Sequence, residues 1–283
     1  MRRSGLATSR ALREFRRNRV AQVGAAILLA LFAIAALAPV LAPEGIDVQH
    51  RERERVRPCR EYPLGTDELG RDQLSRLIWG SRVSLRVGFV VVAVSAVIGI
   101  ALGGVAGYFG GAVDGIVMRV TDVLMAFPGI LLALSLVAML GPSFRNVVLA
   151  LCALGWVRYA RMLRGQILLV RELDFVTAAR SLGASDWRVL SRHVLPNCLA
   201  PLIVEMSLGV AGAILAEATL SFLGLGVQPP EPSWGAMLNR GIDYLRDAPH
   251  LTLFPGGAIM LTVLALNVVG DALRDALDPH SAK

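Results

Sequence analysis

The sequence has very little of three residue types that carry much of enzyme chemistry. Its 283 residues include three cysteines, four histidines and a single lysine, Lys283. A nucleotide-binding loop of the form Gly-x-x-x-x-Gly-Lys-Ser/Thr needs a lysine that precedes Ser or Thr. No such loop occurs, so the sequence excludes a nucleotide hydrolase of that kind.

The few histidines and cysteines argue against two further kinds of site. No His-Glu-x-x-His occurs, an aspartate pair is conceivable only at helix ends, and no Cys/His spacing is typical of a metal site. Cys59 is expected outside the membrane without a disulfide partner in this chain, whereas Cys152 and Cys198 are expected to be small apolar fillers. The histidines all lie outside the long apolar runs, at His50, His193, His250 and His280.

Long apolar runs are abundant, since 54% of the residues are hydrophobic. A run of roughly 20 apolar residues crosses a bilayer as a helix. One run, Asn146–Val157, is short, and it forms a span only if Arg158, Arg161 and Arg164 extend toward the lipid headgroups. The sequence therefore predicts an all-α membrane protein with six transmembrane helices, at Val20–Pro43, Val87–Gly107, Val123–Phe144, Asn146–Val157, Asn197–Pro230 and Leu251–Gly270.

Two features within these runs predict how the helices are shaped and packed. Gly99, Gly103 and Gly107 are four residues apart, which favours close packing of another helix backbone along that stripe. Pro128 lies inside the third run, where it predicts a kink that serves either as a hinge or simply for packing.

The net charge of +7 raises the question of nucleic acid, but the distribution of the charge favours a membrane topology instead. Seven arginines and one acid, Glu14, precede the first apolar run, which places the N-terminus in the cytoplasm. With six spans, residues 175–196 fall on the same side. The segment 44–82 also holds seven arginines up to Arg76, in conflict with an outside location, although neighbouring acids make it nearly neutral.

The predicted division of the chain follows from this topology. No repeat or linker indicates a second domain. The segments are a cytoplasmic N-terminus (1–19), the first span (20–43), an extracytoplasmic segment (44–82), a core of five spans (83–275) and a cytoplasmic tail (276–283).

Residues 175–196 form a polar, arginine-bearing stretch between apolar runs. The pattern predicts two short helices with Gly183 between them, Ser185 or Asp186 capping the second, and Pro196 ending the unit. One face of the first helix carries Phe175, Ala178, Ala179 and Leu182, and the second carries a stripe of Trp187, Leu190 and Val194. From chemistry alone, this hairpin either lies on the lipid surface or lets another protein approach closely.

The same residues resemble the EAA loop of ABC-importer permeases, which is Glu-Ala-Ala, three residues, Gly, nine residues, Ile, one residue and Leu-Pro. Thr177 stands where that pattern has Glu, and His193 stands where it has Ile. The resemblance implies a type I importer permease fold in which this loop is a coupling helix that docks in a groove of a cytoplasmic ATPase. The residues implied in coupling are Thr177, Ala178, Ala179, Leu182, Gly183, Ala184, Ser185, Asp186, Leu195 and Pro196.

A second motif lies in the segment before the second span. Its glycines and carboxylates predict turns closed by Arg–Asp pairs rather than a metal site. It resembles the Gly-Thr-Asp-x-x-Gly-Arg-Asp segment of the second, C-type, permease subunit of dipeptide, oligopeptide and nickel importers. The matching residues are Gly65, Thr66, Asp67, Gly70, Arg71 and Asp72.

The fifth apolar run carries two carboxylates, which are costly inside a membrane unless they face water or a protein group. Glu217, with the neighbouring Ser221 and Phe222, is interpreted either as part of the translocation path or gate, or as a buried carboxyl bonded to a neighbouring helix. Glu205 lies nearer the cytoplasmic end, which favours the second interpretation.

The resemblance implies a permease subunit that moves a peptide inward by alternating access and holds no cofactor itself. Its implied partners are a second permease, two ATP-binding subunits that hold ATP and Mg²⁺, an extracytoplasmic solute-binding protein and membrane lipid, without nucleic acid. Import of nickel or another small solute remains an alternative. An intramembrane enzyme and a non-transporting scaffold or sensor are the alternatives from other classes.

Overall fold

The computed structural model describes residues 18–277. The predictions for residues 1–17 and 278–283, which include most of the arginine-rich N-terminus and most of the tail, lie outside the described residues. Within this range the chain is helical, with short 3-10 turns at Arg51–Arg53 and Ile242–Tyr244 and no strand. The helices are α2 (Arg19–Ala36), α3 (Ala38–Leu41), α4 (Gln73–Phe109), α5 (Gly111–Met125), α6 (Gly129–Leu140), α7 (Phe144–Val170), α8 (Asp174–Ser181), α9 (Asp186–Val189), α10 (Leu195–Phe222), α11 (Trp234–Gly241) and α12 (His250–Leu277).

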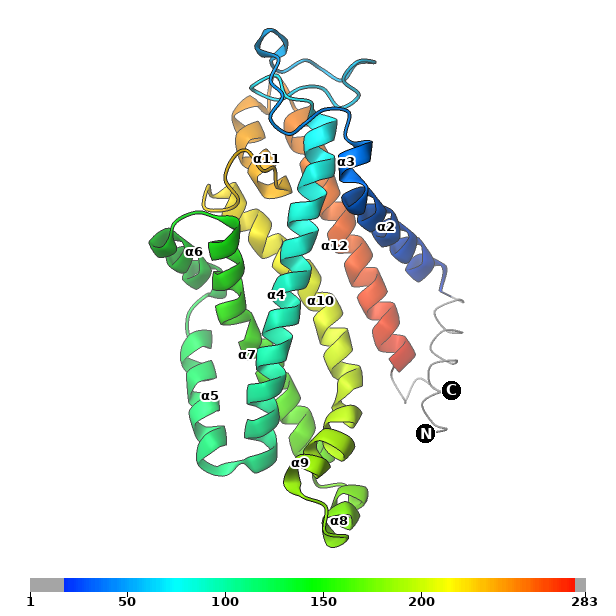
Figure 1. The fold of residues 1–283 in the computed structure, drawn as a ribbon, viewed down its shortest axis with the longest axis vertical. Coiled ribbons are helices and arrows are strands. Elements are labelled where there is room, and N and C mark those ends of the chain that lie inside the picture. The colour runs from blue at the N-terminus through cyan, green and yellow to red at the C-terminus, as the bar shows by residue number, and fades with distance from the viewer. Residues whose placement is uncertain (1–17, 278–283) are drawn as a thin grey trace.

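The bundle is organised around α4, a 37-residue helix that runs along most of its length (Figure 1). Helices α7, α10 and α2 pack against it, and α12 lies between α10 and α2. The hairpin of α8 and α9 projects from one end of the bundle. The loop before α4 and the short helix α11 lie at the opposite end. The two predicted motifs are therefore at opposite ends of the molecule.

The close packing of α4 on α7 follows from the predicted glycine stripe. A Cβ atom built on Gly103 would lie 2.7 Å from the Cα atom of Ala160, and one on Gly107 would lie 3.1 Å from the Cα atom of Arg164. Contacts between backbones at this distance leave no room for a side chain. The prediction that another helix packs along Gly99, Gly103 and Gly107 is confirmed.

The third predicted span, Val123–Phe144, is wrong as a single helix. Helix α5 begins earlier, at Gly111, and α6 leaves it at an angle of 86°. Pro128 lies at the break. It interrupts the helix because a proline cannot donate a backbone hydrogen bond and disfavours helical geometry in the residue before it. Within residues 18–277, five helices are long and apolar enough to cross a membrane, or six if this bent pair counts as one span.

The fourth predicted span is part of a longer helix, α7, whose 27 residues are enough to cross a bilayer. Two of the arginines expected to extend toward lipid headgroups have carboxylate partners within the protein. Arg164 binds Asp114 on α5, with 2.6 Å between Nη2 and Oδ2, and Arg161 forms an ion pair with Asp122 on the same helix. Pairing offsets the cost of placing charges beside hydrocarbon.

Several other boundaries differ from the sequence prediction. Helix α4 begins at Gln73, before the predicted span that starts at Val87, because Asp72 accepts backbone N–H groups of Leu74 and Ser75 and caps it. Helix α10 ends at Phe222, eight residues before the predicted Pro230. Gly224 then takes a left-handed conformation with φ of +80°, which ends the helical backbone.

Candidate functional site

The hairpin at the end of the bundle has the predicted helix–glycine–helix form. Helix α8 ends in a Schellman motif, in which Gly183 N–H donates to Arg180 O at 2.9 Å and Ala184 N–H donates to Ala179 O at 3.2 Å. Gly183 has φ of +79°, a conformation that a residue with a Cβ atom adopts only with strain. The glycine therefore fixes the direction in which the chain leaves α8.

Two details of the predicted hairpin are wrong. Ser185 precedes α9, but its side chain makes no capping hydrogen bond. Pro196 does not end the unit, because helical backbone continues from α9 through a π-helical turn, Leu190–Val194, into α10. The wider turn gives room for the proline ring, which would collide with the carbonyl four residues earlier in an α-helix.

The inner side of the hairpin is anchored to the bundle by an apolar cluster. Val176 and Ala179 of α8 are buried, as are Val189, Leu190 and Val194. They pack with residues at the end of α4 and along α7, namely Tyr108, Leu163 and Ile167. The hairpin is therefore part of the packed core and not a free loop.

Polar and aromatic contacts reinforce this attachment at the end of α4. The Tyr108 hydroxyl donates to Asp186 Oδ1 at 2.8 Å. The Arg180 guanidinium lies over the Tyr108 ring, 5.3 Å from its centre. The Phe109 and Trp187 rings meet edge to face at 5.9 Å. Each hairpin helix thus contacts the end of α4 through its own side chains.

The outer side of the hairpin is open. Phe175, Ala178 and Leu182, three of the four residues of the predicted α8 face, are exposed, and Leu182 has 88% of its surface accessible. Ala179, the fourth, is buried. Among the residues implied in coupling, the exposed ones are Thr177, Ala178, Leu182, Gly183, Ser185, Asp186 and Pro196, whereas Ala184 and Leu195 are partly buried.

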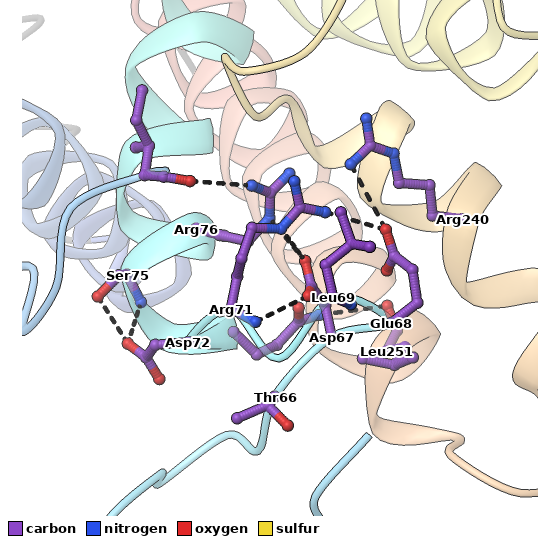
Figure 2. A network of polar contacts seen from close by, with 12 residues as sticks. Thr66, Asp67, Glu68, Leu69, Arg71, Asp72, Ser75, Arg76, Arg240 and Leu251 are labelled. Atoms are coloured by element: carbon purple, nitrogen blue, oxygen red, sulfur yellow. Dashed lines mark hydrogen bonds and ion pairs between the residues drawn. The ribbon is translucent and has the colours of Figure 1, made fainter. Parts of the chain in front are cut away.

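The second motif forms a buried ionic cluster before α4, shown in Figure 2. Asp67 accepts Arg71 Nε at 2.6 Å and lies 3.3 Å from Arg76 Nε. Arg71 also donates to Glu68 at 2.9 Å. Asp67, Arg71 and Arg76 are all nearly inaccessible to solvent. The predicted turn closed by an Arg–Asp pair is confirmed.

Backbone geometry and neighbouring helices hold this turn in place. Gly65 and Gly70 both have positive φ, at +81° and +72°. A Cβ atom on Gly65 would lie 2.7 Å from the His250 ring of α12. Glu68 pairs with Arg240 of α11 at 3.5 Å, and Thr66 O lies 3.4 Å from His250 Nε2. The motif therefore joins the loop to α4, α11 and α12.

Glu217 of α10 is fully buried where α10 meets α4. Its carboxylate accepts the Ser221 hydroxyl at 2.6 Å and the Ser84 hydroxyl of α4 at 3.3 Å. Ser221 is buried with it, whereas Phe222 is partly exposed. These contacts are those of a carboxyl bonded to a neighbouring helix, one of the two interpretations of Glu217.

Two features of the site did not come from the sequence. Tyr108 gave no signal before its contact with Asp186 was seen. The arginines at 158, 161 and 164 are three residues apart, a spacing that puts them near one face of a helix, but their partners lie on α5 and α10. Glu205, for example, forms an ion pair with Arg158. Among residues 18–277 no group of three or more His, Cys, Asp or Glu is placed to hold a metal ion.

Membrane-length helices packed backbone to backbone, with a firmly attached helical hairpin at one end, define a multi-pass membrane protein. Residues 99–283 match the family described as binding-protein-dependent transport system inner membrane component. Residues 7–58 match the N-terminal transmembrane domain of oligopeptide transport permease C.

Individual relatives are similar to this chain over nearly its whole length. The glutathione transport system permease protein GsiD of Pectobacterium atrosepticum is 46% identical over 94% of this chain and 89% of its own. The dipeptide transport system permease protein DppC of Alkalihalophilus pseudofirmus is 41% identical over 95% and 88%. DppC of Bacillus subtilis is 41% identical over 96% and 85%.

The chain belongs to the binding-protein-dependent transport system inner membrane component family. It is a permease subunit of an ABC transporter in the inner membrane and not an enzyme. The resemblance of its two motifs to those of peptide-importer permeases is thereby confirmed at the level of the family.

Proposed function

We propose that this subunit imports peptides, in a complex with a second permease, two ATP-binding subunits that hold ATP and Mg²⁺, and an extracytoplasmic solute-binding protein. The names of its relatives, which include dipeptide and glutathione transport permeases, support a peptide as the solute. Nickel or another small solute is the alternative, and no observation favours it.

The hairpin of α8 and α9 is the proposed contact with the ATPase. The observation that carries this proposal is its two-sided character: one side is buried against α4 and α7, and the other exposes Thr177, Ala178 and Leu182. A rigid element of this kind transmits motion only if it binds the two states of the ATPase with different affinity. The spans then alternate between outward-facing and inward-facing arrangements.

The proposed topology places the hairpin and residues 1–19 and 276–283 in the cytoplasm, with the first span at 20–43. The ionic cluster around Asp67, in the segment 44–82, lies outside, where the solute-binding protein delivers its cargo. Residues 83–275 form the core permease. Labelling tests this orientation: Ser185→Cys, combined with Cys59→Ser, is expected to resist a membrane-impermeant thiol reagent in intact cells. Labelling from outside would overturn the topology.

Gly183→Asp tests the coupling role. The substitution introduces a side chain at φ of +79° on the exposed turn of the hairpin, where no atom lies within 4 Å of the added Cβ. We expect insertion to be intact, and both uptake and transport-coupled ATP hydrolysis to be lost. Gly141→Asp is the matched control, because Gly141 also has positive φ and open surroundings but lies in the α6–α7 turn. Normal uptake by the Gly183 variant would contradict the coupling role.

Uptake measurements identify the solute. Cells that depend on this transporter are supplied with labelled dipeptide, glutathione or Ni²⁺ in separate assays. We expect accumulation of the peptide substrates and competition between them. Uptake of Ni²⁺ alone would replace peptide by metal as the solute while leaving the hairpin's role unchanged.

A further inference from the structure

Three arginines near the end of the bundle opposite the hairpin lack a polar partner. Arg82 and Arg86 lie on α4, and Arg145 lies in the first turn of α7. Within residues 18–277 none of them has an ion pair or hydrogen bond; Arg82 only stacks over the Trp79 ring at 5.2 Å. A guanidinium has five N–H donors, which makes such an arrangement costly next to a membrane.

The paired arginines of α7 show that this is not general for the molecule. Arg158, Arg161 and Arg164 each bind a carboxylate of a neighbouring helix. The three arginines at the opposite end have no such protein partner among the described residues. Arg82 is partly buried and Arg86 and Arg145 are exposed, so their N–H groups are free to bind an anion from outside the chain.

The unpaired arginines line one cavity of about 450 Å³ between the outer parts of α4 and α7. Trp79 and Phe144 form part of its wall. Glu231 is the acidic residue among those lining it, which leaves an excess of two positive charges from three arginines and one carboxylate. The cavity therefore favours an anionic ligand.

The position of the cavity along α4 corresponds to a membrane boundary. The uncharged run Val87–Gly107 begins immediately after Arg86. At 1.5 Å per residue this run is about 30 Å long, which equals the hydrocarbon thickness of a bilayer. Arg86 thus lies at the edge of the hydrocarbon and Arg82 one turn beyond it, at the level of lipid headgroups.

An apolar groove adjoins the cavity and shares two of its arginines. It has a volume of about 300 Å³ and runs between α2 and α4, which lie side by side (Figure 1). Phe32 and Phe89, whose rings are 5.1 Å apart, line it together with Arg82 and Arg86. The same two guanidiniums therefore border both a cationic cavity and an apolar groove.

We propose that this composite site binds an anionic phospholipid. The lipid phosphate is held by Arg82, Arg86 and Arg145, and an acyl chain lies in the groove beside Phe32 and Phe89. Arginine binds phosphate through paired N–H groups, and basic pockets between transmembrane helices suit lipid headgroups. A free anion would use the cavity but not the groove. The orientation proposed above places this lipid in the outer leaflet.

The experiment compares lipids bound to the full-length chain, purified in its transporter complex and reconstituted in nanodiscs. Phosphatidylglycerol binding is measured by native mass spectrometry for the wild type and for Arg82→Gln combined with Arg86→Gln. Loss of two charge-assisted contacts is expected to weaken binding by roughly tenfold or more. Phosphatidylcholine should bind equally weakly to both.

Two further variants distinguish a lipid from other anions. Ala36→Trp fills the groove, because Ala36 lines it, and is expected to weaken phosphatidylglycerol without affecting glycerol phosphate added as a free anion. Arg246→Gln removes an exposed charge from the loop before α12 and should change neither.

Three outcomes would overturn the proposal. Equal phosphatidylglycerol binding by the double arginine variant would remove the headgroup site. An equal loss of phosphatidylglycerol binding in the Arg246 control would show that the effect comes from the overall charge of the protein and not from this site. Unchanged lipid binding together with weaker association of the solute-binding protein would assign the arginines to an acidic protein surface.

Discussion

The hydroxyl of Tyr108, in the last turn of α4, donates a 2.8 Å hydrogen bond to Asp186, the first residue of α9. These residues are 78 positions apart in the sequence. The bond joins the longest helix of the bundle directly to the proposed ATPase-binding hairpin, so that a displacement of the hairpin acts on α4 without passing through a flexible loop.

Tyr108→Phe is expected to loosen this joint while keeping the ring contacts. A single hydrogen bond contributes about 1 kcal/mol, so the protein should still fold. We expect the number of solute molecules taken up per ATP hydrolysed to fall severalfold. Asp186→Asn tests the same bond from the other side, and the double variant should show less than the sum of both effects.

Tyr244→Phe is the control for this experiment, since the Tyr244 hydroxyl has no hydrogen-bond partner in the described part of the chain and its ring lies under Arg55. Equal loss of coupling in this variant, or additive effects of the substitutions at Tyr108 and Asp186, would argue against a direct mechanical role of the bond.

Two adjacent glycines of α4 provide a test of helix packing. Gly103→Ala places a methyl group 2.7 Å from the Cα atom of Ala160, and such overpacking costs about 1–3 kcal/mol. Gly104→Ala meets no atom within 4 Å and should stabilise the helix by about 0.5–1 kcal/mol. Thermal unfolding of the purified complex in detergent measures both. Equal melting temperatures would show that α4 and α7 do not approach as closely as described.

Asp67→Asn is expected to disrupt the ionic cluster before α4. The substitution leaves Arg71 and Arg76 buried without their shared carboxylate, and breaking a buried ion pair in this way typically costs about 3–5 kcal/mol. We expect faster proteolysis of the loop and a lower melting temperature.

The exposed pair of Arg53 and Glu61 in the same loop is the comparison. Glu61→Gln should change stability very little, because solvent screens exposed ion pairs. If both variants were equally stable, the cluster around Asp67 would not hold the loop to the bundle.

Glu217→Gln separates the two interpretations of this buried carboxyl. Glutamine keeps the shape of the side chain and an oxygen that accepts the hydroxyls of Ser84 and Ser221. If Glu217 serves packing, uptake should remain near normal, whereas Glu217→Ala should lower stability by about 1–3 kcal/mol through unpaired hydroxyls. Normal folding of the Gln variant with lost uptake would instead place Glu217 on the translocation path.

The amino-acid sequence by itself determined the features that depend on neighbouring residues. Apolar runs predicted most spans because a bilayer requires a fixed length of hydrophobic helix. Gly183 predicted the hairpin turn, and the residues from Gly65 to Asp72 predicted an Arg–Asp turn, because both depend on contacts within a few residues. The motif also predicted that the hairpin is a surface for another protein, which is the role proposed above.

The tertiary structure alone decided which distant groups meet. Arg164 of α7 finds Asp114 of α5, and Glu217 finds Ser84, across 50 and 133 positions of sequence. Local patterns could not predict the 86° break between α5 and α6 or the π-helical turn before Pro196, because a proline signals disruption without fixing its geometry. The ion pairs, the helix break and the π-helical turn all depend on how whole helices pack. That packing brings charged side chains to partners inside the protein, which the hydrocarbon of a membrane cannot provide.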